Sequence, residues 1–213
     1  HFDGVMMNAA IEVNGCQVLL HHYGYTPFWA DITPHVCWGE DNRITVSVNP
    51  GMQPNSRWYT GAGIFRSVEL VHTPRLHIAG DGIFTYTKRV EYQQEKPCEA
   101  YLCSEVTVCN DTPQTRIVRV EVSLTPDGEK DAVLTRSTSI QVRAMDTATA
   151  ILPLTLPHPR LWSAQDPALY QVCATLTDLG EFRCGLTPAQ KQDGCDQACV
   201  LFGVRTLSAD AVH

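Results

Sequence analysis

The first residues whose types and spacing could do chemistry are cysteines and histidines. Cys184, Cys195 and Cys199 lie close together near the C-terminus, and three thiolates with a fourth ligand can hold a zinc ion. Their spacing matches no established zinc motif, so we expect free thiols in or near a surface loop and no metal. His21 and His22 are adjacent, and neighbouring residues on a strand point to opposite faces, so we interpret them as a turn pair.

The number of cysteines bears on the redox environment of the chain. The nine cysteines form an odd set without C-x-x-C spacing, which favours a reduced interior over a disulfide framework. We therefore expect free thiols and a cytoplasmic location. Asn110-Asp111-Thr112 has the form of a glycosylation sequon, but in a reduced protein we interpret it as part of a turn.

Aromatic residues and glycines between positions 58 and 63 form a second candidate site. Trp58 and Tyr59 have flat apolar faces on which the C–H groups of a pyranose ring could stack. Equally, both rings could pack a loop against a neighbouring domain, and the sequence leaves the two interpretations open. Gly61 and Gly63 allow backbone conformations or close approaches that a Cβ atom forbids.

Composition and charge exclude some classes of partner. The 213 residues carry 16 basic and 23 acidic side chains, a formal net charge of −7, and no Lys/Arg run exceeds two residues. This balance argues against a nucleic-acid partner, because phosphate backbones require clustered positive charge. No apolar stretch approaches the roughly 20 residues that a membrane-spanning helix needs. We therefore expect neither a nucleic-acid nor a membrane partner. No G-x-S-x-G motif of a serine hydrolase occurs either.

Alternation of apolar and polar residues dominates the chain and predicts strands. Ala10–Val13 runs into Asn14-Gly15, which is a strong hairpin signal. Further strands are expected at 16–20, 43–48, 67–71, 83–92, 105–108, 117–122, 132–143, 148–154, 169–176 and 199–204. Because no segment repeats apolar residues at helical spacing for three turns, the sequence predicts an all-β, sandwich-type fold with a boundary near Thr73-Pro74.

Five segments carry a resemblance to a known family. The stretch NSRWYTGAGIFRSV at 55–68 is similar to the signature that closes the sugar-binding jelly roll of family 2 glycoside hydrolases, which include β-galactosidases, β-glucuronidases and β-mannosidases. Four other segments also resemble family motifs, and together with 55–68 they occur along the chain in the family's order. They are HFDGVMMNAAIEVNG (1–15), HHYGYTPFWADITPHV (21–36), HPRLWSAQDPALYQV (158–172) and FGVRT (202–206). Four further motifs in the right order make a chance match a poor explanation.

The resemblance implies a fold and a role. Residues 1–73 are expected to form the C-terminal part of a jelly-roll (galactose-binding-like) domain, 74–206 an immunoglobulin-like β-sandwich, and 207–213 the start of a linker to a catalytic barrel that is absent. In this family both catalytic glutamates lie in the barrel, the first following an Asn, and no Asn-Glu dipeptide occurs here. We therefore expect the non-catalytic N-terminal part of a retaining exo-β-glycosidase, β-galactosidase-like, without catalytic residues or a cofactor of its own.

The resemblance also places a loop at the active-site rim of such an enzyme. Its residues are Asn55, Ser56, Arg57 and Trp58. Some family members carry beside the Trp an Asp that contacts sugar and a cation, whereas Ser56 and Arg57 fill the neighbouring positions here. No metal is therefore expected at this loop, and Arg57 could donate to sugar hydroxyls or to a carboxylate.

Three further motif residues are expected to be structural. Arg66 needs a partner if it is buried, and Asp31 is the candidate. Asp31-Ile32-Thr33 is typical of an Asx-type turn. Trp162, between proline turns, is expected to anchor the core or a domain interface rather than a ligand.

The expected partners follow from the same resemblance. They are the catalytic barrel of the same parent chain and, through the parent, a β-glycoside substrate. Residues 1–73 supply only part of a jelly roll of about eight strands, and the missing strands leave unpaired edges and apolar faces. We therefore expect a homodimer or strand swap through this region. The alternatives are a free-standing carbohydrate-binding or adhesive β-sandwich module and a purely structural immunoglobulin-like scaffold.

Overall fold

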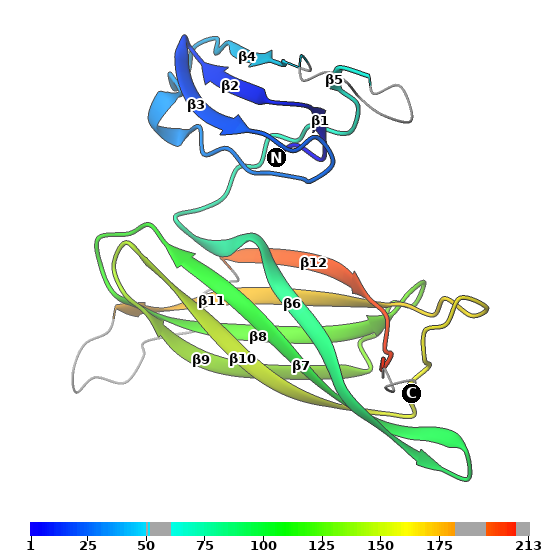
Figure 1. Cartoon of the computed structure of the whole chain (residues 1–213). Helices are drawn as coiled ribbons and strands as arrows, with labels where there is room; N and C mark the ends of the chain where they lie inside the picture. The colour runs from blue at the N-terminus through cyan, green and yellow to red at the C-terminus, as the bar shows by residue number, and fades with distance from the viewer. Residues whose placement is uncertain (50, 52–60, 182–194, 208–213) are drawn as a thin grey trace, which may run out of the picture. The chain divides into compact units, whose positions relative to one another are not determined.

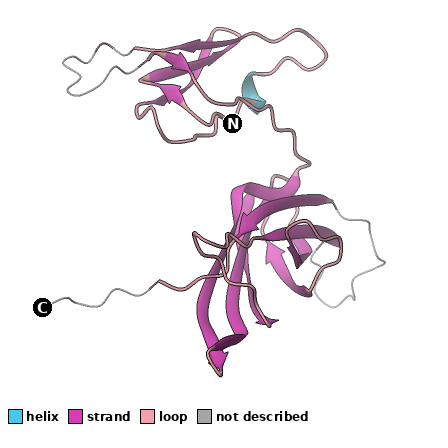
Figure 2. Ribbon diagram, turned by 90° about the vertical axis from the view of Figure 1, so that its right-hand side faces the viewer, coloured by secondary structure: helices cyan, strands magenta, loops and turns pink. Residues whose placement is uncertain are grey.

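The computed structural model describes residues 1–49, 51, 61–181 and 195–207, and strands make up most of them (Figure 2). The described helical structure is one turn of 3-10 helix, η1 (Thr33–His35). Contacts divide the chain into two compact units, which we call unit 1 (His1–His72) and unit 2 (Thr73–His213). The all-β prediction is confirmed.

Unit 1 contains two small antiparallel sheets. In one sheet, β2 (Ala9–Val13) lies between β3 (Cys16–His21) and β4 (Ile44–Ser47); in the other, β1 (Val5–Met6) pairs with β5 (Gly63–Ile64) (Figure 1). A small core of buried apolar residues holds them together: Phe2, Val5, Ala9, Ile11 and Phe28.

The predicted Asn-Gly hairpin is present between β2 and β3. Asn14 has φ of 51° and Gly15 has φ of 83°, as a two-residue turn with two left-handed positions requires. The side chain of Asn14 also accepts a hydrogen bond from the backbone N–H of Arg43 at 2.9 Å. The turn therefore also joins β3 to the segment that leads into β4.

The strand expected at 67–71 does not form. Val68 makes only an isolated bridge with Phe2, and the residues around it stay exposed. Leu70 is 79% exposed, so the alternation of apolar residues in this segment has no buried face to fill. Period two in the sequence indicates a strand only where one face packs on a core.

Unit 1 exposes an unusual share of its apolar side chains. Eleven of the eighteen exposed large hydrophobic residues in the described chain lie in unit 1, which holds about a third of the residues. Three of them are rings in which Tyr25 makes edge-to-face contacts with the other two: the centroids of Tyr25 and Tyr23 are 5.7 Å apart, and those of Tyr25 and Phe65 6.1 Å. We call these three residues the aromatic cluster.

We propose that a second copy of the chain covers this aromatic cluster. Light scattering at micromolar concentration is expected to give about twice the 23.6 kDa chain mass. Tyr25→Asp places a charge in the contact and is expected to shift the protein toward monomer. The matched control is Tyr92→Asp, at a tyrosine of unit 2 that is 56% exposed against 46% for Tyr25, and it should leave the mass unchanged. A wild-type monomer would contradict the proposal.

Unit 2 is a sandwich of two antiparallel sheets with immunoglobulin-like topology. One sheet has the order β10–β7–β6 and the other β12–β11–β8–β9 (Figure 1). The strand bounds are β6 Leu76–Gln93, β7 Lys96–Asn110, β8 Arg116–Pro126, β9 Leu134–Val142, β10 Asp146–Pro157, β11 Tyr170–Glu181 and β12 Asp196–Phe202.

The core of unit 2 follows from the period of two in its strands. On β8, Val118, Val120 and Val122 are fully buried. The alternating buried residues of β7 and β10, in the other sheet, pack against them, and those of β11 lie beside them in the same sheet. The two sheets are also tied at their edges, because the Asp196 carboxylate on β12 accepts a hydrogen bond from the Ile78 N–H of β6 at 2.7 Å. This places β6 and β12 side by side.

Candidate functional site

The predicted rim residues Asn55, Ser56, Arg57 and Trp58 lie outside the described residues, but the chain on either side of them is described. On the N-terminal side, the Asn49 N–H donates to the Met7 carbonyl at 3.1 Å, and the Asn8 side chain donates to the Asn49 carbonyl at 3.0 Å. On the C-terminal side, β5 pairs with β1. Both sides of the loop are therefore held against the same short stretch, 5–8.

The two glycines of this motif differ. Gly63 has φ of +107°, a conformation that L-residues rarely adopt, so a side chain there would strain the start of β5. At Gly61 an added Cβ would meet nothing within 4 Å, and its φ is not in the left-handed region. Only Gly63 therefore shows the backbone requirement expected of both.

The expected ion pair between Arg66 and Asp31 does not form among the described residues. Arg66 is exposed and its guanidinium lies 5.3 Å from the ring centroid of Phe65, so it needs no carboxylate. Asp31 instead accepts the Thr33 N–H at 2.9 Å, which confirms the Asx-type turn at the start of η1. Hydrogen bonds from the side chain and backbone of Thr33 lower the pKa of Asp31, the opposite of what a general acid requires.

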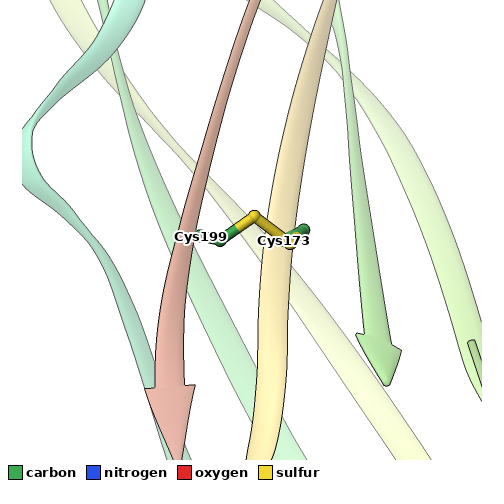
Figure 3. The surroundings of a disulfide bond; sticks show 2 residues. All are labelled: Cys173 and Cys199. Carbon is green, nitrogen blue, oxygen red and sulfur yellow. A yellow bond between two sulfur atoms is a disulfide. The ribbon is translucent and has the colours of Figure 1, made fainter. Parts of the chain in front are cut away.

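Two of the described cysteines form a disulfide, although the cysteine count favoured free thiols. Cys173 on β11 and Cys199 on β12 lie directly opposite each other and are bonded (Figure 3). The expectation of free thiols is therefore wrong for these two residues, and Cys199 is not available as a zinc ligand. Because disulfides are rare in the cytosol, the cysteines no longer favour a cytoplasmic location.

The other two cysteines considered as zinc ligands, Cys184 and Cys195, give no evidence of a metal site either. Cys195 is a half-buried free thiol whose pKa is raised, first by burial and then by the charge of Asp178. Cys184 lies outside the described residues. Within the ranges that the structure describes, no group of three or more His, Cys, Asp or Glu side chains is arranged to hold a metal ion.

A groove of about 520 Å³ lies on unit 2, between β6 and the end of β12. Its lining residues are Thr85, Tyr86, Thr87, Lys88, Trp162, Leu169, Leu201, Phe202, Gly203, Arg205, Thr206 and Leu207. These come from three distant parts of the sequence, so no single motif could have revealed the groove. Among the residues that the structure describes, no carboxylate lines it, so these residues do not supply the paired acids of glycoside hydrolysis.

Trp162 holds the chain that follows β12. The backbone N–H of Trp162 donates to the Val204 carbonyl at 2.9 Å, and the Arg205 guanidinium lies 4.9 Å from the Trp162 ring centroid. A Cβ on Gly203 would come within 2.9 Å of the Trp162 side chain, so this glycine permits a close approach. Trp162 is half-buried and lines the groove, and it is not among the buried core residues of unit 2.

Within the described chain, no helix is long and apolar enough to span a membrane.

The two units define an all-β chain in which a small jelly-roll-type unit precedes an immunoglobulin-like sandwich. Two family models match it in that order: "Glycosyl hydrolases family 2, sugar binding domain" over residues 1–74 and "Glycosyl hydrolases family 2" over residues 83–183. The chain belongs to family 2 of the glycosyl hydrolases.

Known proteins support this assignment along nearly the whole chain. The β-galactosidase BoGH2A of Bacteroides ovatus is 33% identical over 99% of this chain, which covers 23% of that protein. A solved family 2 glycosyl hydrolase of Bacteroides cellulosilyticus matches with a TM-score of 0.80 and 29% identity over 97% of this chain and 26% of its own. The β-glucuronidase of Bacteroides uniformis matches with a TM-score of 0.79 and 26% identity, over 95% of this chain and 24% of its own. The chain thus spans about a quarter of the length of these relatives.

Proposed function

We propose that this chain is the non-catalytic N-terminal part of a retaining exo-β-glycosidase that is β-galactosidase-like. In this proposal the two units support a catalytic barrel, and the loop containing Arg57 contributes to the rim of its active site. The observation that carries the proposal is the ordered match of both family models along a chain that spans only about a quarter of its relatives.

The chemistry of the described residues agrees with a supporting role. Retaining hydrolysis requires two carboxyl groups about 5–5.5 Å apart, one of them a general acid with a raised pKa. The groove on unit 2 has no carboxylate among its described lining residues. Asp31, the acidic motif residue of unit 1, has a lowered pKa and is engaged in a turn.

Activity measurements on the chain and on a longer reading frame test the proposal. The 213-residue chain is expected to release no nitrophenol from nitrophenyl β-galactoside or β-glucuronide, whereas the longer protein should hydrolyse the β-galactoside. In the longer protein, Arg57→Ala is expected to lower kcat/KM roughly tenfold, because a charged hydrogen bond to the sugar is lost. The control Lys130→Ala, a like change in charge on an exposed turn of unit 2, should have no effect. Turnover by the isolated chain would refute the proposal.

The exposed aromatic cluster favours a second candidate, a free-standing carbohydrate-binding module. Tyr23 and Tyr25 are 58% and 46% exposed and could stack on a pyranose ring. Calorimetric titration of the isolated chain with galactose separates the two candidates. Micromolar binding would favour the module, while no binding is expected if the chain acts only as part of a longer enzyme.

A further inference from the structure

We propose that the groove between β6 and the end of β12 binds a carbohydrate that carries a carboxylate, such as a uronic acid unit. This site lies entirely within unit 2. It goes beyond the proposed function, because it requires neither a catalytic barrel nor the loop of unit 1.

Two cations without carboxylate partners give the groove its charge. Lys88 comes from β6 and Arg205 from the segment after β12, and in the described part of the chain neither forms an ion pair. The chain as a whole carries a formal charge of −7. A concave surface whose described lining has two positive groups and no acid is therefore a local exception, and it attracts anions.

Arg205 is positioned before any ligand binds. Its guanidinium lies over the Trp162 indole with 4.9 Å between Cζ and the ring centroid, and its backbone N–H donates to the Thr87 hydroxyl at 3.3 Å. Stacking on an aromatic face leaves the N–H groups at the edge of the guanidinium free to bind a carboxylate with two parallel hydrogen bonds. Less side-chain entropy is then lost on binding than with a freely rotating arginine.

The other walls of the groove suit a sugar ring better than a simple inorganic anion. Leu169, Leu201 and Phe202 supply apolar surface for C–H groups, and Thr206 supplies a hydroxyl. The volume of about 520 Å³ falls within the range of small-molecule sites, which is roughly 300–1,000 Å³. The combination of apolar walls, hydroxyl groups and two cations matches the chemistry of a carboxylated carbohydrate.

Titration with three small ligands tests whether the groove recognises both the carboxylate and the sugar ring. Sodium glucuronate is expected to bind the 213-residue chain with a dissociation constant on the order of 1 mM at low salt, and several-fold more weakly when salt screens the charges. Glucose has the same ring without the carboxylate, and acetate has the carboxylate without the ring. Both are expected to bind at least tenfold more weakly. Equal binding of glucose or of acetate would overturn the proposal, as would the absence of saturable glucuronate binding.

Variants locate the binding in the groove. Arg205→Ala and Lys88→Ala are expected to weaken glucuronate binding about tenfold each, because each removes a charge-assisted contact. Both side chains are exposed, so the thermal midpoint should not change and a loss of binding reports on the site. Arg136→Ala, an exposed arginine of β9 outside the lining, is the matched control.

Resonance shifts give a second, independent measurement. The indole N–H signal of Trp162, identified as the one missing in Trp162→Phe, is expected to move during the glucuronate titration. Unchanged affinity in both Arg205→Ala and Lys88→Ala, or shifts confined to unit 1, would refute the groove as the site.

Discussion

Asn110→Ala is expected to lower the free energy of unfolding of unit 2 by about 3 kcal/mol, because it removes a fully buried hydrogen-bonding group. Asn110 is the last residue of β7, and its side-chain NH₂ donates to the carbonyls of Gln114 at 2.9 Å, Val142 at 3.2 Å and Arg143 at 2.9 Å. Its carbonyl oxygen accepts the N–H and the hydroxyl of Thr112, at 3.1 Å and 2.6 Å. One side chain thus joins the end of β7 to the β7–β8 turn and to the end of β9, in the opposite sheet.

Native-state hydrogen exchange of the slowest amides of β8 measures this change within unit 2 alone. Thr112→Val is a graded control, since it removes the hydroxyl but keeps the backbone bond to Asn110, and it should lose about 1 kcal/mol. A loss of less than 1 kcal/mol for Asn110→Ala would show that the network contributes little. The buried, hydrogen-bonded side chain of Asn110 also confirms its interpretation as part of a turn.

The parts of the fold that could be predicted are those encoded in local alternation and turn chemistry. Period-two patterns located β8 and β10 because one face of each packs on a core, and Asn14-Gly15 located its hairpin because both residues tolerate positive φ. The same reasoning failed at 67–71, where no core face meets the apolar residues. Alternation alone does not reveal whether another part of the chain packs on the apolar face.

The features that could not be predicted depend on register between distant segments. The expectation that Arg66 pairs with Asp31 assumed that Arg66 is buried, but it is exposed and lies against Phe65. The groove joins residues 85–88, the pair Trp162 and Leu169, and residues on and after the end of β12, which meet only when β6 lies beside β12. Family motifs predicted the domain order and named Trp162, yet they did not indicate that Arg205 would be held over its ring.

The disulfide was missed for the same reason. Cys173 and Cys199 are 26 residues apart, and an odd total of cysteines gives no information about which pair lies opposite in a sheet. Their pairing follows from the β11–β12 register, in which Val172 faces Val200 and Ala174 faces Ala198. Cys173 and Cys199 therefore point to the same side of the sheet, away from the buried face that holds Val172 and Ala174.

Replacing this disulfide, as Cys173→Ser with Cys199→Ser, is expected to lower the free energy of unfolding by about 3 kcal/mol. A cross-link between residues 26 apart restricts the unfolded chain, and the loop-closure relation gives roughly 3–4 kcal/mol for a loop of this length. Because β12 is an edge strand, held within its sheet by β11 alone, the unlinked strand is expected to separate first. Urea unfolding followed by far-UV circular dichroism measures the loss, since most strand residues belong to unit 2.

Reduction of the unmodified chain by dithiothreitol gives a second route to the same state. Cys199 is exposed, so a thiolate of the reductant can attack it, and two exchange steps yield two protein thiols and oxidised reductant. The unfolding midpoint should then fall to that of the double variant, while the double variant itself should not respond to the reductant. Cys16→Ser and Cys37→Ser, at two exposed free thiols of unit 1, should leave the midpoint unchanged in both conditions. Nine free thiols in the denatured, unreduced protein, or equal midpoints with and without reductant, would contradict a stabilising cross-link between β11 and β12.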